Sequence, residues 1–181
     1  MELTESTVAA ATGGDSEAVS AVYRALAPRV LGYLRARGAE DPEGLTHEVF
    51  VAVIPRLSRL AGGVAGLRTL VFSVAHARYV DETRRRARRP AQTTYEQEYD
   101  ERTSPSAETA VVEQSGSTHI MGLLDRLGED QRNVISLRIL GDLSLEQTAE
   151  VLGKSTGAVK QLQRRGLENL RQLIEEGGTD R

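Results

Sequence analysis

The stretch from Ser144 to Arg165, "SLEQTAEVLGKSTGAVKQLQRR", limits the possible folds of this chain more than any other. Its "GKS", beginning at Gly153, fits either the end of a phosphate-binding loop or the turn between two helices. A phosphate-binding loop needs another glycine five positions earlier and a strand before it. Thr148 stands at that position, and the preceding residues have helical periodicity. These two departures exclude the phosphate-binding loop.

The same stretch has the spacing of a helix-turn-helix. Ala149 is small where the two helices must cross closely, and Gly153 supplies the turn because glycine tolerates a positive φ. Val159, six residues beyond, is placed to fill the core between the helices. Ser155 is placed to cap the second helix, which we expect to run from about Thr156 to Glu176.

The second helix of this motif predicts a DNA-reading surface. Its outward positions are Lys160, Gln161, Arg164 and Arg165. Its inward positions are Val159, Leu162, Leu167 and Leu170. Arginine can bond guanine and glutamine can bond adenine in the major groove, whereas lysine mostly meets phosphate. A solvated charged face on an ordinary helical hairpin is the alternative, and the helix-turn-helix spacing favours DNA reading.

The rest of the chain is predicted to be almost all helix, because apolar residues recur at helical spacing and no run alternates like a strand. Asp15 predicts the start of a helix that Pro28 should kink or divide. Asp41 followed by proline predicts the start of the next helix, with Pro55 bending its last turn. Ser144, with a glutamine three residues later, has the pattern of a capping box.

Two composition changes divide the chain. The glycine-rich residues 61–66 predict a loop before a third long helix over 67–89. Residues 90–117 are rich in Thr, Ser, Glu, Gln and Pro and predict a flexible linker. Charge follows the same division: residues 84–89 hold five arginines, residues 90–117 hold six acids against one base, and residues 154–171 hold five bases against one acid. Two basic patches therefore flank an acidic connector in a chain whose net charge is only −3.

Several classes of protein do not fit this composition. There is no Cys, so disulfides and thiolate metal sites are excluded. No apolar run approaches the roughly 20 residues of a membrane span, and the first residues are unlike a signal peptide. We therefore expect a cytoplasmic protein. The three histidines stand apart, no catalytic motif occurs, and neither an enzyme nor a cofactor or metal is expected.

The whole chain resembles the extracytoplasmic-function (ECF) group of bacterial RNA polymerase sigma factors. The resemblance is carried by "DPEGLTHEVF" from Asp41, "VDETRRRARRP" from Val80 and the long stretch "LGEDQRNVISLRILGDLSLEQTAEVLGKSTGAVKQLQRRGLENLR" from Leu127. It implies an all-α fold of two small helical domains joined by a flexible linker. The expected boundaries are a tail over 1–13, sigma region two over 14–89, the linker over 90–117, region four over 118–176 and a tail over 177–181.

The resemblance also implies which surface binds core RNA polymerase. The residues that match the family there are Asp41, Leu45, Glu48 and Phe50. Leu45 is better explained as a core residue, so Glu48 and an exposed Phe50 are the expected contacts. The family commonly has Asp where Gly44 stands and Gln where His47 stands, so polymerase affinity or its regulation is expected to differ.

The third helix would face the upstream promoter element near the point of strand opening. Opening needs cations along the phosphates and flat groups against unstacked bases. The cations would be Arg84, Arg85, Arg86 and Arg88. His76 and Tyr79 are the stacking candidates, although a hydrogen-bonded or solvated histidine explains His76 equally well. A solvated helix end is the alternative for the arginines.

In region four the resemblance places Lys160, Gln161 and Arg164 at the more distant promoter element, with Arg165 on the DNA backbone. Gln163 is either a further contact or a half-buried polar residue. The implied partners are core RNA polymerase, promoter DNA and possibly an anti-sigma protein. A helix-turn-helix regulator that binds duplex DNA without polymerase is the alternative; it explains the C-terminal third but not the arginine-rich helix end or the match from Asp41 to Phe50.

Overall fold

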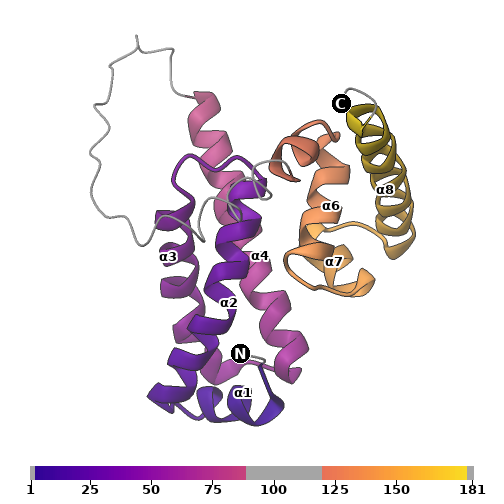
Figure 1. Cartoon of the computed structure of the whole chain (residues 1–181). Coiled ribbons are helices and arrows are strands. Elements are labelled where there is room, and N and C mark those ends of the chain that lie inside the picture. Colours follow the sequence, from indigo (N-terminus) through magenta and orange to yellow (C-terminus); the bar gives the residue numbers. More distant parts are fainter. Residues whose placement is uncertain (1–2, 89–119, 179–181) are drawn as a thin grey trace.

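The computed structural model describes residues 3–88 and 120–178, and every regular element in those ranges is helical (Figure 1). The elements are α1 (Glu5–Thr12), α2 (Ser16–Ala36), α3 (Pro42–Val53), the 3-10 helix η1 (Ile54–Arg59), α4 (Gly63–Arg88), α6 (Glu129–Ile139), α7 (Leu145–Leu152) and α8 (Thr156–Gly178). Residues 120–125 are also helical. We call residues 3–88 the N-terminal unit and residues 120–178 the C-terminal unit; the predicted linker over 90–117 and Arg89 lie outside the described residues.

The first helix replaces most of the tail that the sequence predicts over residues 1–13. Thr4 caps α1 by accepting a hydrogen bond from the backbone N–H of Thr7 at 3.2 Å. Val8 and Ala11 are 2% and 3% exposed and join the core of the N-terminal unit. Burial of these two side chains stabilises a helix too short to form alone.

The long helices α2, α3 and α4 enclose an apolar core. Asp15 and Asp41 cap α2 and α3 as predicted, accepting bonds from the backbone N–H groups of Ala18 at 2.7 Å and Gly44 at 2.8 Å. Pro28 does not divide α2, which is continuous from Ser16 to Ala36. The α-helical part of the next element ends at Val53, just before Pro55, and the chain continues as η1.

Helix α4 begins inside the segment predicted as a loop. Gly62 and Gly63, at the junction with the helix, have φ angles of 82° and 57°, so the loop ends where α4 begins. The carboxylate of Glu5 accepts hydrogen bonds from the Val64 N–H, at 3.2 Å to each oxygen. An acid of α1 therefore caps α4, an arrangement between distant residues that local sequence does not reveal.

The C-terminal unit contains the predicted helix-turn-helix in α7 and α8. Both halves of the capping box form at Ser144 and Gln147, and Gly153 ends α7 in the left-handed region with φ 61°. Ser155 caps α8 by accepting from the Ala158 N–H at 3.2 Å. Val159 is fully buried in one cluster with Val134 and Ala149, as its position predicts.

The two units pack against each other. Leu137 and Leu143 of the C-terminal unit are buried in the same apolar cluster as Phe72 of α4. Ala36, at the end of α2, is buried with Leu124 and residues around it in a second cluster. Figure 1 shows α6 and α7 beside α4, with α8 on the far side of the C-terminal unit.

Candidate nucleic-acid and protein-binding surfaces

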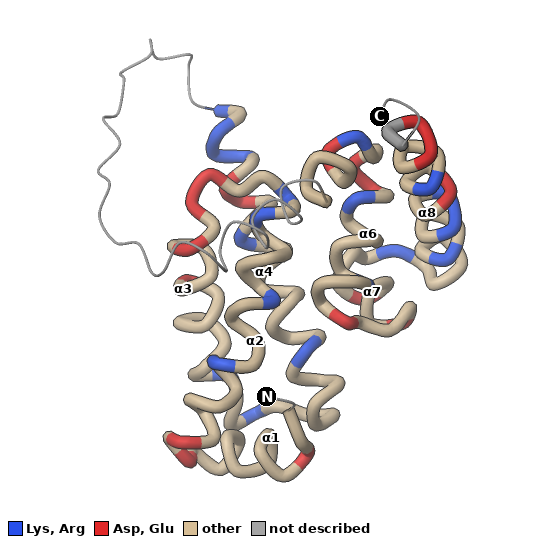
Figure 2. The backbone as a smooth tube through the Cα atoms, viewed as in Figure 1, with Lys and Arg blue, Asp and Glu red and all other residues tan. Residues whose placement is uncertain are grey.

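The outer face of α8 gathers the side chains that the sequence predicts for DNA reading. Lys160, Gln161, Arg164 and Arg165 are all exposed. Figure 2 shows basic residues along α8, which lies on the far side of the C-terminal unit from α4. Arg164 lies 3.6 Å from Glu168 one turn on, an exposed ion pair that screening makes weak. The basic face is therefore free of strong internal partners.

The inner face of α8 differs from the prediction at one position. Leu162 and Leu170 are half-buried as expected, but Leu167 is 45% exposed. Gly166 takes the inward place instead, and a Cβ there would lie 3.0 Å from Cγ1 of Ile135. Position 166, not 167, continues the inward stripe of Val159, Leu162 and Leu170, so Leu167 lies beside that stripe and faces solvent.

Arg138 and Lys154 hold α8 and the turn before it against α6. Gln163 is half-buried and accepts a hydrogen bond from Nε of Arg138 at 3.2 Å, which favours the half-buried alternative over a further DNA contact. Arg138 also donates to the carbonyl of Leu143. Lys154 pairs with Asp130 at 3.2 Å, so this lysine holds the turn of the motif against the start of α6.

The end of α4 presents the predicted arginines to solvent. The exposed members are Arg84, Arg85, Arg86 and Arg88. Arg86 lies 3.8 Å from Glu40, and Nε of Arg85 donates to the carbonyl of Asp81 at 3.3 Å. Figure 2 shows this basic helix end beside an acidic group at the start of α3.

Neither of the two predicted stacking residues is fully exposed, since Tyr79 is buried and His76 is half-buried. Tyr79 is 8% exposed, and the guanidinium of Arg37 lies over its ring at 4.6 Å from the centroid. Nδ1 of His76 and the hydroxyl of Tyr33 are hydrogen-bonded at 2.9 Å. Burial lowers the pKa of His76, the nearby Arg37 lowers it further, and Glu129 opposes them. His76 is thus a hydrogen-bonded, half-buried histidine, and Tyr79 is too buried to stack on a base in this arrangement.

The predicted polymerase-binding residues divide by burial. Asp41 and Glu48 are exposed on α3, whereas Leu45 is 5% exposed, as its core role predicts. Phe50 is 2% exposed, so the expectation of an exposed Phe50 is wrong. Its ring packs edge-to-face against Tyr23, with centroids 4.7 Å apart, because the helical turn places it on the inner face of α3.

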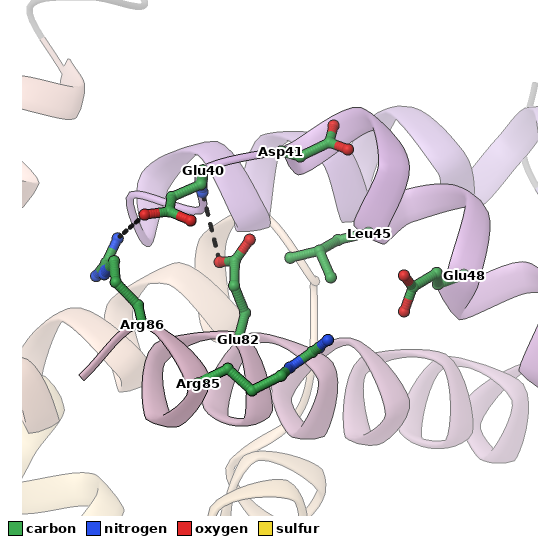
Figure 3. Close-up of a pocket in the computed structure, with 7 residues that line it drawn as sticks. All are labelled: Glu40, Asp41, Leu45, Glu48, Glu82, Arg85 and Arg86. Carbon is green, nitrogen blue, oxygen red and sulfur yellow. Dashed lines mark hydrogen bonds and ion pairs between the residues drawn. The ribbon is translucent and has the colours of Figure 1, made fainter. Parts of the chain in front are cut away.

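A pocket of about 300 Å³ lies between α3 and the end of α4 (Figure 3). Its lining residues are Glu40, Asp41, Leu45, Glu48, Glu82, Arg85 and Arg86. The backbone N–H of Glu40 donates to Glu82 at 3.4 Å, and Glu48 lies 3.9 Å from Nε of Arg78. The pocket therefore joins Asp41 and Glu48 of the predicted polymerase-binding surface with Arg85 and Arg86 of the predicted DNA-binding surface. The sequence reasoning missed Glu40 and Glu82, which could be found only by bringing α3 and α4 together.

An apolar groove of about 160 Å³ on the C-terminal unit also escaped the sequence reasoning. Its lining residues are Ile120, Leu123, Leu124, Ile135, Ser136, Ile139, Leu140, Leu170 and Ile174. Ile120, Ile139 and Ile174 are each more than half exposed. Exposed apolar patches of this kind mark protein-interaction sites. The sequence held one signal for this groove, because its helices carry more apolar residues than one buried stripe needs.

Among residues 3–88 and 120–178, no group of three or more His, Cys, Asp or Glu is placed to hold a metal ion. No helix in the same ranges is long and apolar enough to span a membrane.

Comparison with known proteins identifies relatives along nearly the whole chain. The family profile "Sigma-70, region 4" matches residues 123–172. The chain is 32% identical over 188 residues to the ECF RNA polymerase sigma factor SigD of Mycobacterium tuberculosis, covering 98% of this chain and 86% of that protein. It is 32% identical over 176 residues to the ECF RNA polymerase sigma factor ShbA of Streptomyces griseus, covering 92% of each. The solved structure of CnrH in complex with the cytosolic domain of CnrY has the same fold, with a TM-score of 0.66 at 19% identity over 95% of this chain and 97% of that one.

Proposed function

Because this chain belongs to the ECF group of bacterial RNA polymerase sigma factors, we propose that its two units divide promoter recognition and polymerase binding between them. Members of this family are DNA-binding initiation factors, and this chain is an alternative sigma factor that directs RNA polymerase to promoters. We infer that it has no catalytic activity of its own, needs no cofactor and acts in the cytoplasm with the polymerase.

The observation that carries the proposal is the exposed basic face of α8 on a helix-turn-helix. In our proposal Lys160, Gln161 and Arg164 enter the major groove of the more distant promoter element, while Arg165 contacts phosphate. Arginine and glutamine have the donors needed for bidentate contacts with guanine and adenine. Ser155, at the first turn of α8, supports the helix end that would approach the groove.

The end of α4 is proposed to contact the upstream element where the strands open. Its four exposed arginines supply the positive charge that strand separation needs (Figure 2). Each phosphate neutralised adds about 0.9 to the slope of log affinity against log salt on duplex DNA. In this proposal Tyr79 and His76 act only after their present covering is removed.

The acidic start of α3 is proposed to bind a basic surface of core RNA polymerase. Asp41 and Glu48 carry this part, because both are exposed and line the pocket with Leu45 between them (Figure 3). Phe50 supports the helix from its inner side instead of touching the partner. The exposed apolar groove of the C-terminal unit supports a second protein contact, with the polymerase or with an anti-sigma protein.

In vitro transcription tests the proposal. Purified protein and bacterial core polymerase are incubated with a library of linear promoter fragments, alongside core alone and protein alone. We expect discrete run-off products only when both components are present, and the enriched fragments define the promoter. Duplex binding by the protein alone, with no polymerase-dependent product, would establish a regulator instead.

Paired variants on the enriched promoter then test the residue roles. Arg164→Ala should weaken the free energy of promoter binding by about 1–3 kcal/mol and relax base specificity at one position. Arg165→Ala should weaken binding to all sequences and lower the slope of log affinity against log salt by about 1. Arg84→Ala with Arg85→Ala should reduce open-complex formation while leaving duplex binding by α8 intact. Equal effects of Arg164→Ala and Arg165→Ala on every sequence would contradict base reading by α8.

A further inference from the structure

One polar side chain stands in the inward stripe of α8. The stripe passes through Val159, Gln163, Gly166 and Leu170, which follow one another at intervals of four, three and four residues. Gln163 is half-buried there, between apolar residues and a glycine. Removing an amide from water is unfavourable unless it finds hydrogen-bond partners inside the protein. The Gln163 side chain therefore needs a partner from a neighbouring helix.

Arg138, near the end of α6, is that partner. Its Nε donates to Oε1 of Gln163 at 3.2 Å. Its Nη1 donates to the backbone carbonyl of Leu143, the residue just before the N-cap of α7. Leu143 is 1% exposed, so its position is fixed by the core. One guanidinium therefore ties α8 both to α6 and to the start of α7.

The bond from Arg138 to Gln163 lies at one end of the contact between α6 and α8. At the other end, Nδ2 of Asn169 donates to Oε1 of Gln131 at 3.0 Å. Between these two bonds, a Cβ on Gly166 would lie 3.0 Å from Cγ1 of Ile135. The contacting positions rise from 131 to 138 along α6 and fall from 169 to 163 along α8, so the two helices are antiparallel.

Among these contacts, the arginine bond has the most control over the rotation of α8 about its own axis. Apolar packing is non-directional, whereas a hydrogen bond weakens steeply when its donor and acceptor are misaligned. The bond from Asn169 to Gln131 is exposed, so water can replace it at little cost. Arg138 is half-buried, and its planar guanidinium holds two acceptors from different elements at once.

A small rotation of α8 would matter at its outer face. A helix with its side chains is about 10–12 Å across, so a rotation of about 20° moves the outer side-chain ends by about 2 Å. A hydrogen bond from nitrogen to oxygen tolerates donor–acceptor distances of only about 2.7–3.2 Å. Such a rotation would therefore break a bidentate contact made by Gln161 or Arg164 and could bring a neighbouring base into reach.

We propose that Arg138 and Gln163 are positioning residues, whose hydrogen bond sets the rotation of α8 and thereby the bases that Gln161 and Arg164 reach. This inference rests on the proposed function of α8 in promoter reading. It requires the planar guanidinium of Arg138 and the amide of Gln163. A contact between Arg138 and a DNA phosphate would instead require only the positive charge, and it would not involve Gln163.

Base discrimination in transcription tests this role. Core polymerase and the full chain transcribe the enriched promoter and fragments with one base pair changed in its more distant element. The ratio of the two rates is the readout, because loss of folded protein lowers both rates equally. A good base contact gives a ratio on the order of 5 to 150. Arg138→Lys keeps the charge but loses the planar guanidinium, and it should lower the wild-type ratio at least about threefold.

Gln163→Met removes the amide but fills a similar space, and it should lower the ratio as Arg138→Lys does. Because both variants break the same bond, the double variant should lower the ratio no further. An unchanged ratio in either single variant would overturn the positioning role, and so would losses that multiply in the double variant.

Arg132→Lys is the matched control. Arg132 is also half-buried on α6, but it binds the backbone carbonyl of Asp125 at 2.6 Å and its carboxylate at 3.0 Å instead of α8. The same substitution there should leave the discrimination ratio unchanged. A loss equal to that of Arg138→Lys would show that any weakening of α6 has this effect, and it would overturn the specific role of Arg138.

The bond itself can be observed in the free chain by NMR with isotope-labelled arginine. The Nε–H of Arg138 should exchange with water several-fold more slowly than that of the exposed Arg84, and Gln163→Met should remove most of this difference. Equally fast exchange in the wild type would overturn the bond. If the wild type gives no polymerase-dependent product, the proposed function fails. A product with unchanged ratios in the variants leaves that function standing and overturns the positioning role alone.

Discussion

At the scale of single residues, burial separates the side chains that hold α3 in place from those that can meet a partner. Phe50 and Glu48 are two positions apart on one helix, and the helical turn sends the first inward and the second outward. Gly44 serves the same helix end in another way, since a Cβ at that position would collide with the Asp41 carboxylate that caps the helix. A chain with aspartate at this position would have to move that carboxylate.

Replacing Phe50 should therefore affect the fold before it affects binding. Phe50→Ala removes a ring that is 2% exposed and packed against Tyr23, and we expect it to lower the free energy of unfolding by about 3–5 kcal/mol. Glu48→Gln, its control on the outer face, should stay within about 0.5 kcal/mol. Urea denaturation measures both, and a stability loss from Phe50→Ala under about 1 kcal/mol would show that the ring is not a core residue.

His76 should make stability depend on pH. It faces the Tyr33 hydroxyl, Arg37 and Glu129, and burial lowers its pKa in the folded chain below the ordinary 6.5. As pH falls below about 6.5, the unfolded chain binds a proton at His76 more readily than the folded chain does. The stabilisation is therefore fully present above about 6.5 and is lost as pH falls toward the lower pKa of the folded chain.

Thermal melts between about pH 7.5 and about pH 5.5 check this dependence. The wild type should lose more melting temperature across this range than His76→Gln. His47→Gln, at an exposed position, should keep the wild-type dependence. Parallel curves for the wild type and His76→Gln would show that another group is responsible.

At the scale of elements, the turn between α7 and α8 decides where the recognition helix points. Gly153 ends α7 at φ 61°, and Val159 then fixes α8 in the cluster with Val134 and Ala149. Because both features depend on local spacing, the motif was predictable from the sequence alone. The exposure of Leu167 was not predicted, because the inward stripe of α8 passes through Gly166, which packs against Ile135.

Substitution at the turn should cost backbone strain alone. A Cβ at Gly153 would meet nothing within 4 Å. Gly153→Ala should therefore lower the free energy of unfolding by about 1–2 kcal/mol, because alanine is strained in the left-handed conformation. Gly153→Asn should lose less, because asparagine tolerates this region better. Chemical denaturation of the two variants is the measurement, and equal losses would point to a steric cause instead.

At the scale of the whole molecule, the sequence predicted the helices and the helix-turn-helix but not the way the units pack. Asp142 looks like an ordinary turn residue and Gln147 like an ordinary capping residue, and local patterns hold no information about their bonds to α4. Tyr79 and His76 were placed on the correct helix, but the covering of Tyr79 by Arg37 and the hydrogen bond of His76 to Tyr33 depend on contacts between distant residues. The boundary of the N-terminal unit shifted for the same reason, since α1 is stabilised by the core that it joins.

The shared core predicts how the molecule unfolds. Leu143 is 1% exposed and packs in the apolar cluster of the N-terminal unit, so the wild type should unfold in one calorimetric transition. Leu143→Ala should weaken this packing by about 2–5 kcal/mol and separate the transition into two. Leu173→Ala, at a half-buried position of α8 away from that core, is the control and should shift the transition without dividing it. One undivided transition in Leu143→Ala would mean that the units are coupled by other contacts.

Gln147 carries a consequence for how this protein can diversify. Its Oε1 accepts from the Ser144 N–H in the capping box, while its Nε2 reaches across to α4. A mutation at this codon would change the start of α7 and the hold on α4 together, so the two traits are pleiotropic. A mutation at Asp142 would change almost only the contact with α4. Lineages that change how strongly the two units are held together would therefore be expected to mutate Asp142 more freely than Gln147.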